Sequence, residues 1–540
     1  MKPNALCSDL PFRILYNNDL TNVTTCIWHA HPNATDPFDP SMLRESVREV
    51  AGLADVHLIQ LATGRVPWYQ SRIYSMEEHR DWYCRHFDVS PDDPIFTTGY
   101  NGYLLRGGDL LQDFIGYCRE FGQRSFVSMR MNDTHGLEWV DTPGNRRFPH
   151  CISRFYAEHP EYRLSDGKGW YERGLDWAHE EVRTSLLELI EEQCKGYDLD
   201  GFELDFQRHP RFFREAETTP EFRAEIMTGF IRAVREILDR TARRGQRRYL
   251  SVRIPCYRVM LSDCGLDVTA FRSAGVDLTV ISDHYFSSMD TEFRELAARS
   301  GGVPAFFECC HTTYTGRQVG LKPGQPNYDS FTFRRTTPEQ YRTLANLAYR
   351  AGGAGISFFN FAYYREHGTD GRGPFTEPPF TVLRDCADPE TVANAAQDAL
   401  LTPGWSIWGG PVQKIRTKQL PRTMTAGAPE SFRMEIYPQP GAASVTRLRV
   451  QTAETLTDQV FSAWLNGKKL EPTRDISEPY GVQYPPLLGT PETLRAFTVP
   501  LSDIRAGENT VTLSLAGSDC KVIILNLCTP FVSDGSVPVS

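Results

Sequence analysis

The sequence predicts an α/β protein: a (β/α)₈ TIM barrel in residues 1–404, followed by an all-β sandwich in residues 405–540. Three observations support this prediction. Strand-like and helix-like stretches alternate along the first part, which is typical of parallel sheets. No glycine-rich phosphate turn follows the first strand, which disfavours a doubly wound sheet. After Thr402-Pro403-Gly404 the chain changes to short alternating runs between turn residues.

Eight strand-like stretches can be counted in the barrel region. They lie near residues 23, 55, 124, 199, 249, 277, 303 and 354. The first is expected at 23–29, the fourth at 199–206 and the seventh at 303–308. Helical patterns separate them, including an amphipathic one at 108–121 and a long one at 176–195. Eight strands alternating with helices match a closed barrel, whose active sites lie at the carboxyl ends of the strands.

The region after residue 405 contains six alternating runs of the kind that form half-buried strands. They span residues 431–437, 445–451, 460–465, 494–499, 510–515 and 521–527. Asn466-Gly467, directly after the third run, is a strong hairpin-turn signal. These features predict the β-sandwich, which we interpret as an accessory domain.

Composition excludes several classes of function. The net charge of −10 disfavours nucleic acid or an anionic membrane as the main partner. No run of 18 apolar residues exists, so no membrane span is expected. The amino-terminal residues lack the apolar stretch of a secretory signal, so we expect a cytoplasmic protein. The oligomeric state is not predicted.

No cofactor or metal is expected. The 13 cysteines are scattered without zinc-ligand spacing, and we interpret them as reduced and buried. His29 and His31 share a face at the end of the first predicted strand, but no carboxylate lies close by in sequence. The chain has neither a Gly-x-Ser-x-Gly elbow nor a Walker loop, which disfavours Ser/His/Asp hydrolysis and nucleotide chemistry.

The fourth strand carries the strongest chemical signal. Leu204 and Phe206 alternate with Glu203 and Asp205, so the two acids share one face of the strand. Pro210 cannot donate a ladder hydrogen bond, which places the acids near the carboxyl end of the strand. Because unpaired buried charge is costly, such acids have either a chemical role or basic partners.

Glu308 ends the seventh strand and faces the fourth in an eight-stranded barrel. A glycosidase needs two such carboxyl groups: one protonates the departing oxygen, and the other attacks the anomeric carbon or activates water. Asp205 lies nearer the mouth than Glu203. We therefore predict Asp205 and Glu308 as the catalytic pair, with Glu203 as the next candidate. The alternative for Glu308 is that it holds an arginine.

Polar and aromatic side chains at strand ends and in the following loops are predicted to bind substrate. They are Arg130, Asn132, Arg208, Arg253, Asp283, His284, Tyr285, Asn360, Trp28, Arg65 and Trp170. For each arginine alone, an ion pair with a neighbouring acid is the simpler interpretation. A surplus of guanidinium groups would instead suit a carboxylate or sulfate on the sugar, so we also hypothesise an acidic or sulfated glycan.

The segment Tyr197-Asp198-Leu199-Asp200-Gly201-Phe202-Glu203-Leu204-Asp205-Phe206, with Arg208 and Pro210, resembles the strand-four motif D-G-[IF]-E-L-D-F-x-R-x-P of glycoside hydrolases with a family-10-like TIM barrel. Arg130-Met131-Asn132-Asp133-Thr134-His135 is similar to their strand-three end. The resemblance covers roughly residues 12–390. It implies Glu203 or Asp205 as acid/base and Glu308 as its partner. This chain departs from family-10 xylanases, whose Asn-Glu pair on strand four is replaced here by Glu-Leu-Asp.

Two other functions stay open. A polysaccharide lyase would abstract a proton next to a uronate, with His284 or a tyrosine as base and the arginines neutralising the carboxylate. A non-catalytic barrel would bind carbohydrate without turnover. An oligosaccharide or larger glycan is the expected partner in each case.

Overall fold

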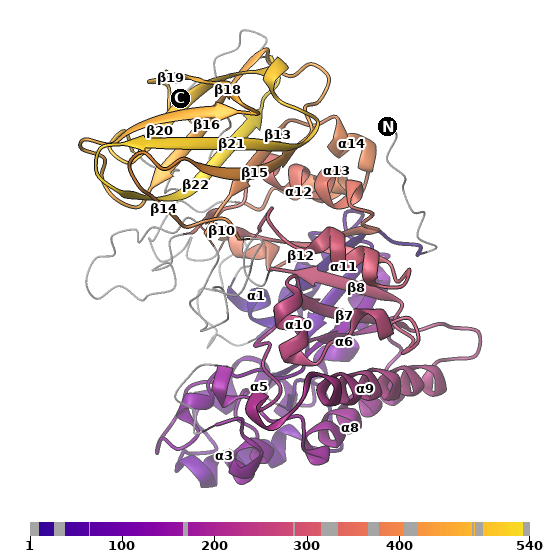
Figure 1. Cartoon of the computed structure of the whole chain (residues 1–540). Coiled ribbons are helices and arrows are strands. Elements are labelled where there is room, and N and C mark those ends of the chain that lie inside the picture. The colour runs from indigo at the N-terminus through magenta and orange to yellow at the C-terminus, as the bar shows by residue number, and fades with distance from the viewer. Residues whose placement is uncertain are drawn as a thin grey trace.

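The computed structural model describes most of the chain. The residues that it describes are 10–25, 38–63, 65–165, 171–283, 287–314, 333–365, 377–403, 418–477, 480 and 490–532. They form a closed barrel and, after it in the sequence, two antiparallel sheets that Figure 1 shows in orange and yellow. Among the described helices, none combines the length and apolarity that crossing a bilayer requires.

Eight parallel strands close the barrel. They are β1 (Ile14–Asn18), β2 (Val56–Gln60), β5 (Arg124–Arg130), β6 (Gly201–Asp205), β7 (Tyr249–Pro255), β8 (Leu278–Ser282), β9 (Ala305–Cys310) and β12 (Gly355–Phe359). Each strand pairs with the next in this order, and β12 closes the ring by pairing with β1. The predicted eight-stranded parallel barrel is therefore confirmed, and seven strands lie within a few residues of their predicted positions.

The first strand lies earlier in the sequence than predicted. The start of the expected strand at 23–29 belongs to helix α1, Leu20–Thr25, and its remainder lies outside the described residues. The Val and Thr residues of α1 favour a strand by propensity, but tertiary packing overrides so weak a preference. The correction matters for the site, because the first strand ends at Asn18 and is followed by Asp19, rather than ending near Trp28.

Helices surround the barrel. They are α2 (Pro40–Arg48), α3 (Met76–Phe87), α4 (Pro94–Thr97), α5 (Gly99–Leu105), α6 (Leu110–Glu120), α7 (Arg154–Glu158), α8 (Glu180–Gly196), α9 (Pro220–Thr241), α10 (Arg258–Cys264), α11 (Phe293–Arg299), α12 (Pro338–Arg350), α13 (Thr381–Cys386) and α14 (Pro389–Ala393). The long helices α8 and α9 lie side by side along the barrel (Figure 1). Helix α9 begins at Pro220 because the Thr219 side chain accepts the Phe222 backbone N–H.

The interior of the barrel changes from apolar to polar along the strands. Near their amino ends the inward positions hold Phe126 and Phe306, with Gly201 on the strand beside Phe126. A Cβ at Gly201 would lie 2.5 Å from the Phe126 ring, so any other residue there would force that ring to move. Two residues further on, Glu203 and Glu308 occupy the inward positions. Charged groups therefore gather at the carboxyl ends of the strands.

Two short hairpins extend the barrel region: β3 (Ala62–Thr63) pairs with β4 (Val66–Pro67), and β10 (Thr312–Tyr314) pairs with β11 (Phe333–Arg335). The second hairpin follows β9 directly, so it rises from the end of the ring where the charged groups lie.

The C-terminal region forms two antiparallel sheets. Their strands are β13 (Gln397–Leu401), β14 (Arg422–Met424), β15 (Glu430–Ile436), β16 (Val445–Thr452), β17 (Val460–Leu465), β18 (Lys468–Lys469), β19 (Glu471–Thr473), β20 (Leu494–Pro500), β21 (Gly507–Ala516) and β22 (Cys520–Thr529). Asn466 and Gly467 turn the chain between β17 and β18 with positive φ angles of 52° and 84°, as the sequence predicted. The first strand, β13, starts before residue 405, while the division into domains stays a prediction.

Candidate active site

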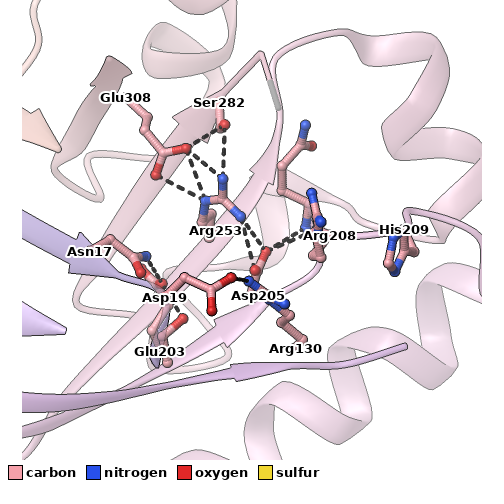
Figure 2. A network of polar contacts seen from close by, with 12 residues as sticks. Asn17, Asp19, Arg130, Glu203, Asp205, Arg208, His209, Arg253, Ser282 and Glu308 are labelled. Atoms are coloured by element: carbon pink, nitrogen blue, oxygen red, sulfur yellow. Dashed lines mark hydrogen bonds and ion pairs between the residues drawn. The ribbon is translucent and has the colours of Figure 1, made fainter. Parts of the chain in front are cut away.

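A single arginine joins the predicted catalytic pair. Arg253 on β7 donates through Nη1 to both oxygens of Asp205, each at 2.9 Å. Its Nε and Nη2 donate to Glu308, at 2.9 Å to Oε2 and 2.6 Å to Oε1. Figure 2 shows the guanidinium between the two carboxylates. The structure thus brings the acids of β6 and β9 together, as predicted, but around a shared cation.

This group is buried. Asp205 is 2% exposed, Glu308 1% and Arg253 0%. Burial alone would lower the pKa of Arg253, but the charges of Asp205 and Glu308 outweigh it and raise that pKa above its ordinary value. Arg253 also lies 4.3 Å from the ring centre of Phe359, which covers it with a cation–π contact.

Glu203 lies one step deeper in the barrel and is held by neutral groups. Its Oε1 accepts from the amide of Asn17 at 2.9 Å and from the hydroxyl of Ser128 at 2.8 Å. Its Oε2 accepts from the hydroxyl of Ser251 at 2.9 Å. Burial, helped by the negative charge of Asp205, raises the pKa of Glu203 to about 7. Glu203 therefore lies beneath Asp205, and its role in catalysis stays a prediction.

A second network lies at the ends of β1 and β5. Arg130 pairs with Asp19 at 2.5 Å and with Asp133 at 3.0 Å. Burial would raise the pKa of Asp133, but its hydrogen bond with His135 and the charge of Arg130 hold that pKa well below its ordinary value. The sequence predicted Arg130 but neither acid. Asp19 was missed because the first strand was placed too late.

Asp133, His135 and His209 form a cluster with the size of a metal site, since one ligand atom of each lies within 4.8 Å of the others. Hydrogen bonding argues against this use. Arginine can only donate, so the 2.7 Å contact of Arg208 with Nε2 of His135 puts the histidine proton on Nδ1, which donates to Asp133 at 2.6 Å. Nδ1 of His209 accepts the Thr134 backbone N–H at 2.9 Å. The nitrogens facing Asp133 are therefore already engaged, and the cluster fits a hydrogen-bond network.

A third group joins the barrel to the C-terminal region. Lys418 approaches Asp283, after β8, at 3.2 Å and Asp290 at 2.9 Å. The Asp283 side chain is 19% exposed. Burial raises its pKa, although the charge of Lys418 opposes the shift. No sequence pattern pointed to Lys418, which lies 135 residues from Asp283 in the chain.

Three other predicted binding residues are buried within the fold, and their role in binding stays a prediction. The Asn132 amide donates to the backbone carbonyls of Leu175 and Arg211, at 2.9 and 2.7 Å, and so fastens two loops together. Arg65 is buried and donates to the carbonyl of Val182 at 3.0 Å, away from the three networks. Asn360, after β12, is buried with a positive φ of 52°.

Four predicted residues, Trp28, Trp170, His284 and Tyr285, lie outside the described part of the chain. Their role in binding stays a prediction.

Gln207 is a candidate that the sequence analysis missed. Its side chain is 2% exposed, and among the described residues its Oε1 has no hydrogen-bond partner. Its backbone N–H donates to Asp205 at 2.9 Å. The alternation of Glu203, Asp205 and Gln207 along one face was the signal that could have found it.

No protein-family model and no curated protein matches this sequence. Among solved structures, the chain is similar to the glycoside hydrolase domain of PgaB (BpsB) from Bordetella bronchiseptica, with 11% sequence identity and a TM-score of 0.40. This match covers 70% of this chain and 99% of that domain. The chain is also similar to a glycoside hydrolase family 18 N-acetylglucosaminidase from Paenibacillus barengoltzii, with 12% identity, 69% and 99% covered, and a TM-score of 0.37.

Over more of its length, the chain is similar to the noncanonic maltogenic α-amylase AmyB from Thermotoga neapolitana, with 11% identity, 95% and 98% covered, and a TM-score of 0.33. Likenesses at this level carry no conclusion about activity or site residues. The fold assignment rests on the closed ring of strands itself.

Proposed function

We propose that the chain is a glycoside hydrolase that acts at the carboxyl ends of the barrel strands. One observation carries the proposal: Asp205, Asp283 and Glu308, from three different strand ends, lie at the same end of a closed barrel. Active sites of such barrels lie at this end, and two carboxyl groups are what the hydrolysis of a glycosidic bond requires. The proposal rests on this site and not on the structural likenesses.

Asp205 suits the anionic role. Its Oδ1 accepts the backbone N–H groups of Gln207 and Arg208, at 2.9 and 3.0 Å, and both oxygens accept from Arg253. These donors fix the direction of the carboxyl group. A carboxylate held in this way can stabilise or attack a developing positive anomeric centre.

Two groups compete for the role of proton donor. Glu308, the predicted partner, is ion-paired with Arg253, so it can donate only after a substrate rearranges that contact. Asp283 is more exposed, and its raised pKa favours the protonated form that an acid requires. We retain Glu308 as the first candidate and place Asp283 beside it.

The hypothesis of an acidic or sulfated glycan rested on a surplus of arginine side chains, and the contacts of these arginines do not support it. Arg130 and Arg253 are each ion-paired with two carboxylates, and Arg208 donates to His135. These guanidinium groups are therefore not a surplus. Ion pairing was the simpler interpretation of each arginine, and it accounts for Arg130 and Arg253.

A second candidate function is a barrel that binds carbohydrate without cleaving it. The contact that favours it is the bridge of Arg253 to both Asp205 and Glu308, because an arginine that neutralises both acids suits a structural role. No contact of the described residues favours the lyase alternative.

We also propose that the two C-terminal sheets form the predicted accessory β-sandwich. Buried side chains of both sheets, such as Val450 on β16 and Leu513 on β21, belong to one hydrophobic cluster. Two sheets that share a core in this way are the arrangement of a sandwich.

The experiment is a hydrolysis screen of neutral, amino and acidic oligosaccharides, with release of new reducing ends as the readout. Glu308→Gln and Asp283→Asn then identify the proton donor on the best substrate. Losing general acid catalysis should lower kcat by ~10²–10⁴-fold. The variant that removes the proton donor should show this decrease in kcat, and the other variant should show a much smaller decrease. Specific binding without any release of reducing ends would favour the second candidate.

A further inference from the structure

Lys418 brings a positive charge from the C-terminal region to the carboxyl end of the barrel. Its Nζ donates to Asp283, directly after β8, at 3.2 Å and to Asp290, between β8 and α11, at 2.9 Å. It also donates to the hydroxyl of Ser288. The Lys418 side chain is only 5% exposed. A buried lysine loses its hydration, so these oxygen atoms have to replace the water that it gives up.

The residues after Lys418 fix it to the C-terminal sheets. The side chain of Gln419 donates to the backbone carbonyl of Arg433 on β15 at 2.9 Å, and it accepts the backbone N–H of the same residue at 2.7 Å. Leu420 is buried in the hydrophobic cluster of the two sheets. Since the next two residues in the chain are held in this way, the position of Lys418 depends on the sheets and not on a barrel strand.

Other contacts attach the sheets to the barrel beside Lys418. Met289 packs against the hydrophobic clusters of both parts, and its sulfur accepts the backbone N–H of Leu400 on β13 at 2.9 Å. Arg294 on α11 pairs with Glu435 on β15 at 2.8 Å. Apolar packing and an ion pair thus join the two parts without Lys418. Attachment alone therefore does not explain why a buried lysine reaches Asp283.

Asp283 lies between a positive and a negative charge, those of Lys418 and Asp290. Among the described residues, the other titratable side chains that face it are Tyr257, Cys256 and Cys310. Burial raises the pKa of each of these three groups well above its ordinary value, so they are uncharged near neutral pH. Burial also raises the pKa of Asp283, the charge of Lys418 lowers it and the charge of Asp290 raises it. The two charged neighbours therefore act on the Asp283 proton in opposite directions.

We propose that Lys418 is a positioning residue of the active site: held by the C-terminal sheets, it fixes the carboxyl group of Asp283 at the barrel mouth and controls how readily that group gives up its proton. The Asp283 side chain is 19% exposed and can meet a substrate, whereas the buried Lys418 acts through it. The C-terminal region thereby contributes to the chemistry of the barrel. The inference rests on the proposed function, in which Asp283 is a candidate proton donor.

The test is the pH dependence of kcat/KM for the full chain on the best substrate of the oligosaccharide screen. A proton donor is active while it is protonated, so its pKa sets the pH at which activity falls on the basic side. Lys418→Met removes the charge that favours the carboxylate and should move this fall to higher pH, by roughly 1 pH unit or more. Asp290→Asn removes the opposing charge and should move the fall to lower pH. Lys418→Arg keeps the positive charge and should keep the profile close to that of the wild type.

Arg294→Met is the matched control. It also breaks a contact between barrel and sheets, but the partners of Arg294 are Glu435 and the backbone of Arg350. The fall in activity on the basic side should therefore stay where it is in the wild type. A general loss of stability cannot move this fall in opposite directions for two variants. If Lys418→Met does not fold, the direction of the change in Asp290→Asn decides. No change in Asp290→Asn, or a change to higher pH, would overturn the inference.

Failure of the inference is distinguishable from failure of the proposed function. Hydrolysis with the same pH profile in every variant would support the hydrolase, favour Glu308 as proton donor and overturn the inference.

The absence of hydrolysis would contradict the proposed function, and the proton of Asp283 can then be followed by unfolding. The free energy of unfolding differs between the wild type and Asp283→Asn by an amount that changes with pH up to the folded pKa of Asp283. This upper limit should rise when Lys418→Met is added to both proteins and fall when Asp290→Asn is added. Such changes would support control of Asp283 by Lys418, and an unchanged limit would overturn it.

Discussion

Asn17, at the end of the first barrel strand, donates to Glu203 on the fourth strand at a distance of 2.9 Å. Together with Ser128 and Ser251, it holds this acid where burial raises the pKa to about 7. The contact crosses the interior of the ring, so the barrel contains a polar layer directly beneath its mouth. Several properties of the protein follow from this layer and from the three ion-pair groups above it.

Glu203→Gln should change how stability depends on pH. The folded pKa of Glu203, about 7, lies above its ordinary value of 4.5. Its contribution is therefore full below about pH 4.5 and is lost as the pH rises to about 7. The variant should gain stability relative to the wild type over this range, by up to roughly 3 kcal/mol. Chemical denaturation at a series of pH values measures the difference. Parallel curves for the two proteins would contradict the assignment.

Arg253→Met should be strongly destabilising, because it leaves Asp205 and Glu308 buried without their cation. Breaking a buried pair in this way costs about 3–5 kcal/mol. The matched control is Arg258→Met, whose side chain is 50% exposed and pairs with Glu292 and Glu295. That change should cost about 0–1 kcal/mol. Thermal unfolding compares the two, and equal losses would show that the Arg253 bridge adds no stability of its own.

Lys418→Met tests the third ion-pair group. The Lys418 side chain is 5% exposed and serves both Asp283 and Asp290. Its removal should cost about 3–5 kcal/mol by the same reasoning. Lys468→Met is the control, because that lysine is 62% exposed in its pair with Asp503 and should matter little. Melting temperatures of the two variants measure the difference. A shift for Lys418→Met no larger than that of the control would mean that water solvates Asp283 and Asp290 in place of the lysine.

Gly201→Ala tests the packing beneath the polar layer. The added methyl group would meet the Phe126 ring at 2.5 Å, so we expect a loss of about 1–3 kcal/mol from overpacking. The control is Gly116, exposed in α6, where an added methyl group would meet nothing within 4 Å. Gly116→Ala should stabilise the helix by about 0.5–1 kcal/mol. Denaturant midpoints should therefore move in opposite directions. A midpoint unchanged by Gly201→Ala would show that Phe126 can shift at little cost.

Sequence periodicity predicted most of the barrel, because buried parallel strands leave short apolar runs with polar ends. It failed at the first strand, where the Val and Thr residues of Leu20–Thr25 look like a strand but form a helix. That error hid Asn17 and Asp19. The alternation of Glu203 with Asp205 correctly predicted that the two acids share one face of the strand, and the structure turns that face into the barrel.

Ion-pair partners were harder to predict. Arg253 was expected to bind substrate, and only the arrangement of the four neighbouring strands β6 to β9 brings it between Asp205 and Glu308. Lys418 comes from a distant part of the chain, so no local pattern could assign it to Asp283. Such choices depend on distances across the fold, which spacing along the sequence does not contain.

The central claim is that Asp205 takes part directly in cleaving a glycosidic bond. The most direct test measures kcat/KM of the Asp205→Asn variant on the best substrate of the oligosaccharide screen. The control is Asp239→Asn, because the Asp239 side chain on α9 is 60% exposed. The account predicts a loss of at least ~100-fold for Asp205→Asn and nearly unchanged kcat/KM for the control. A folded Asp205→Asn variant with kcat/KM within about twofold of the wild type would contradict it.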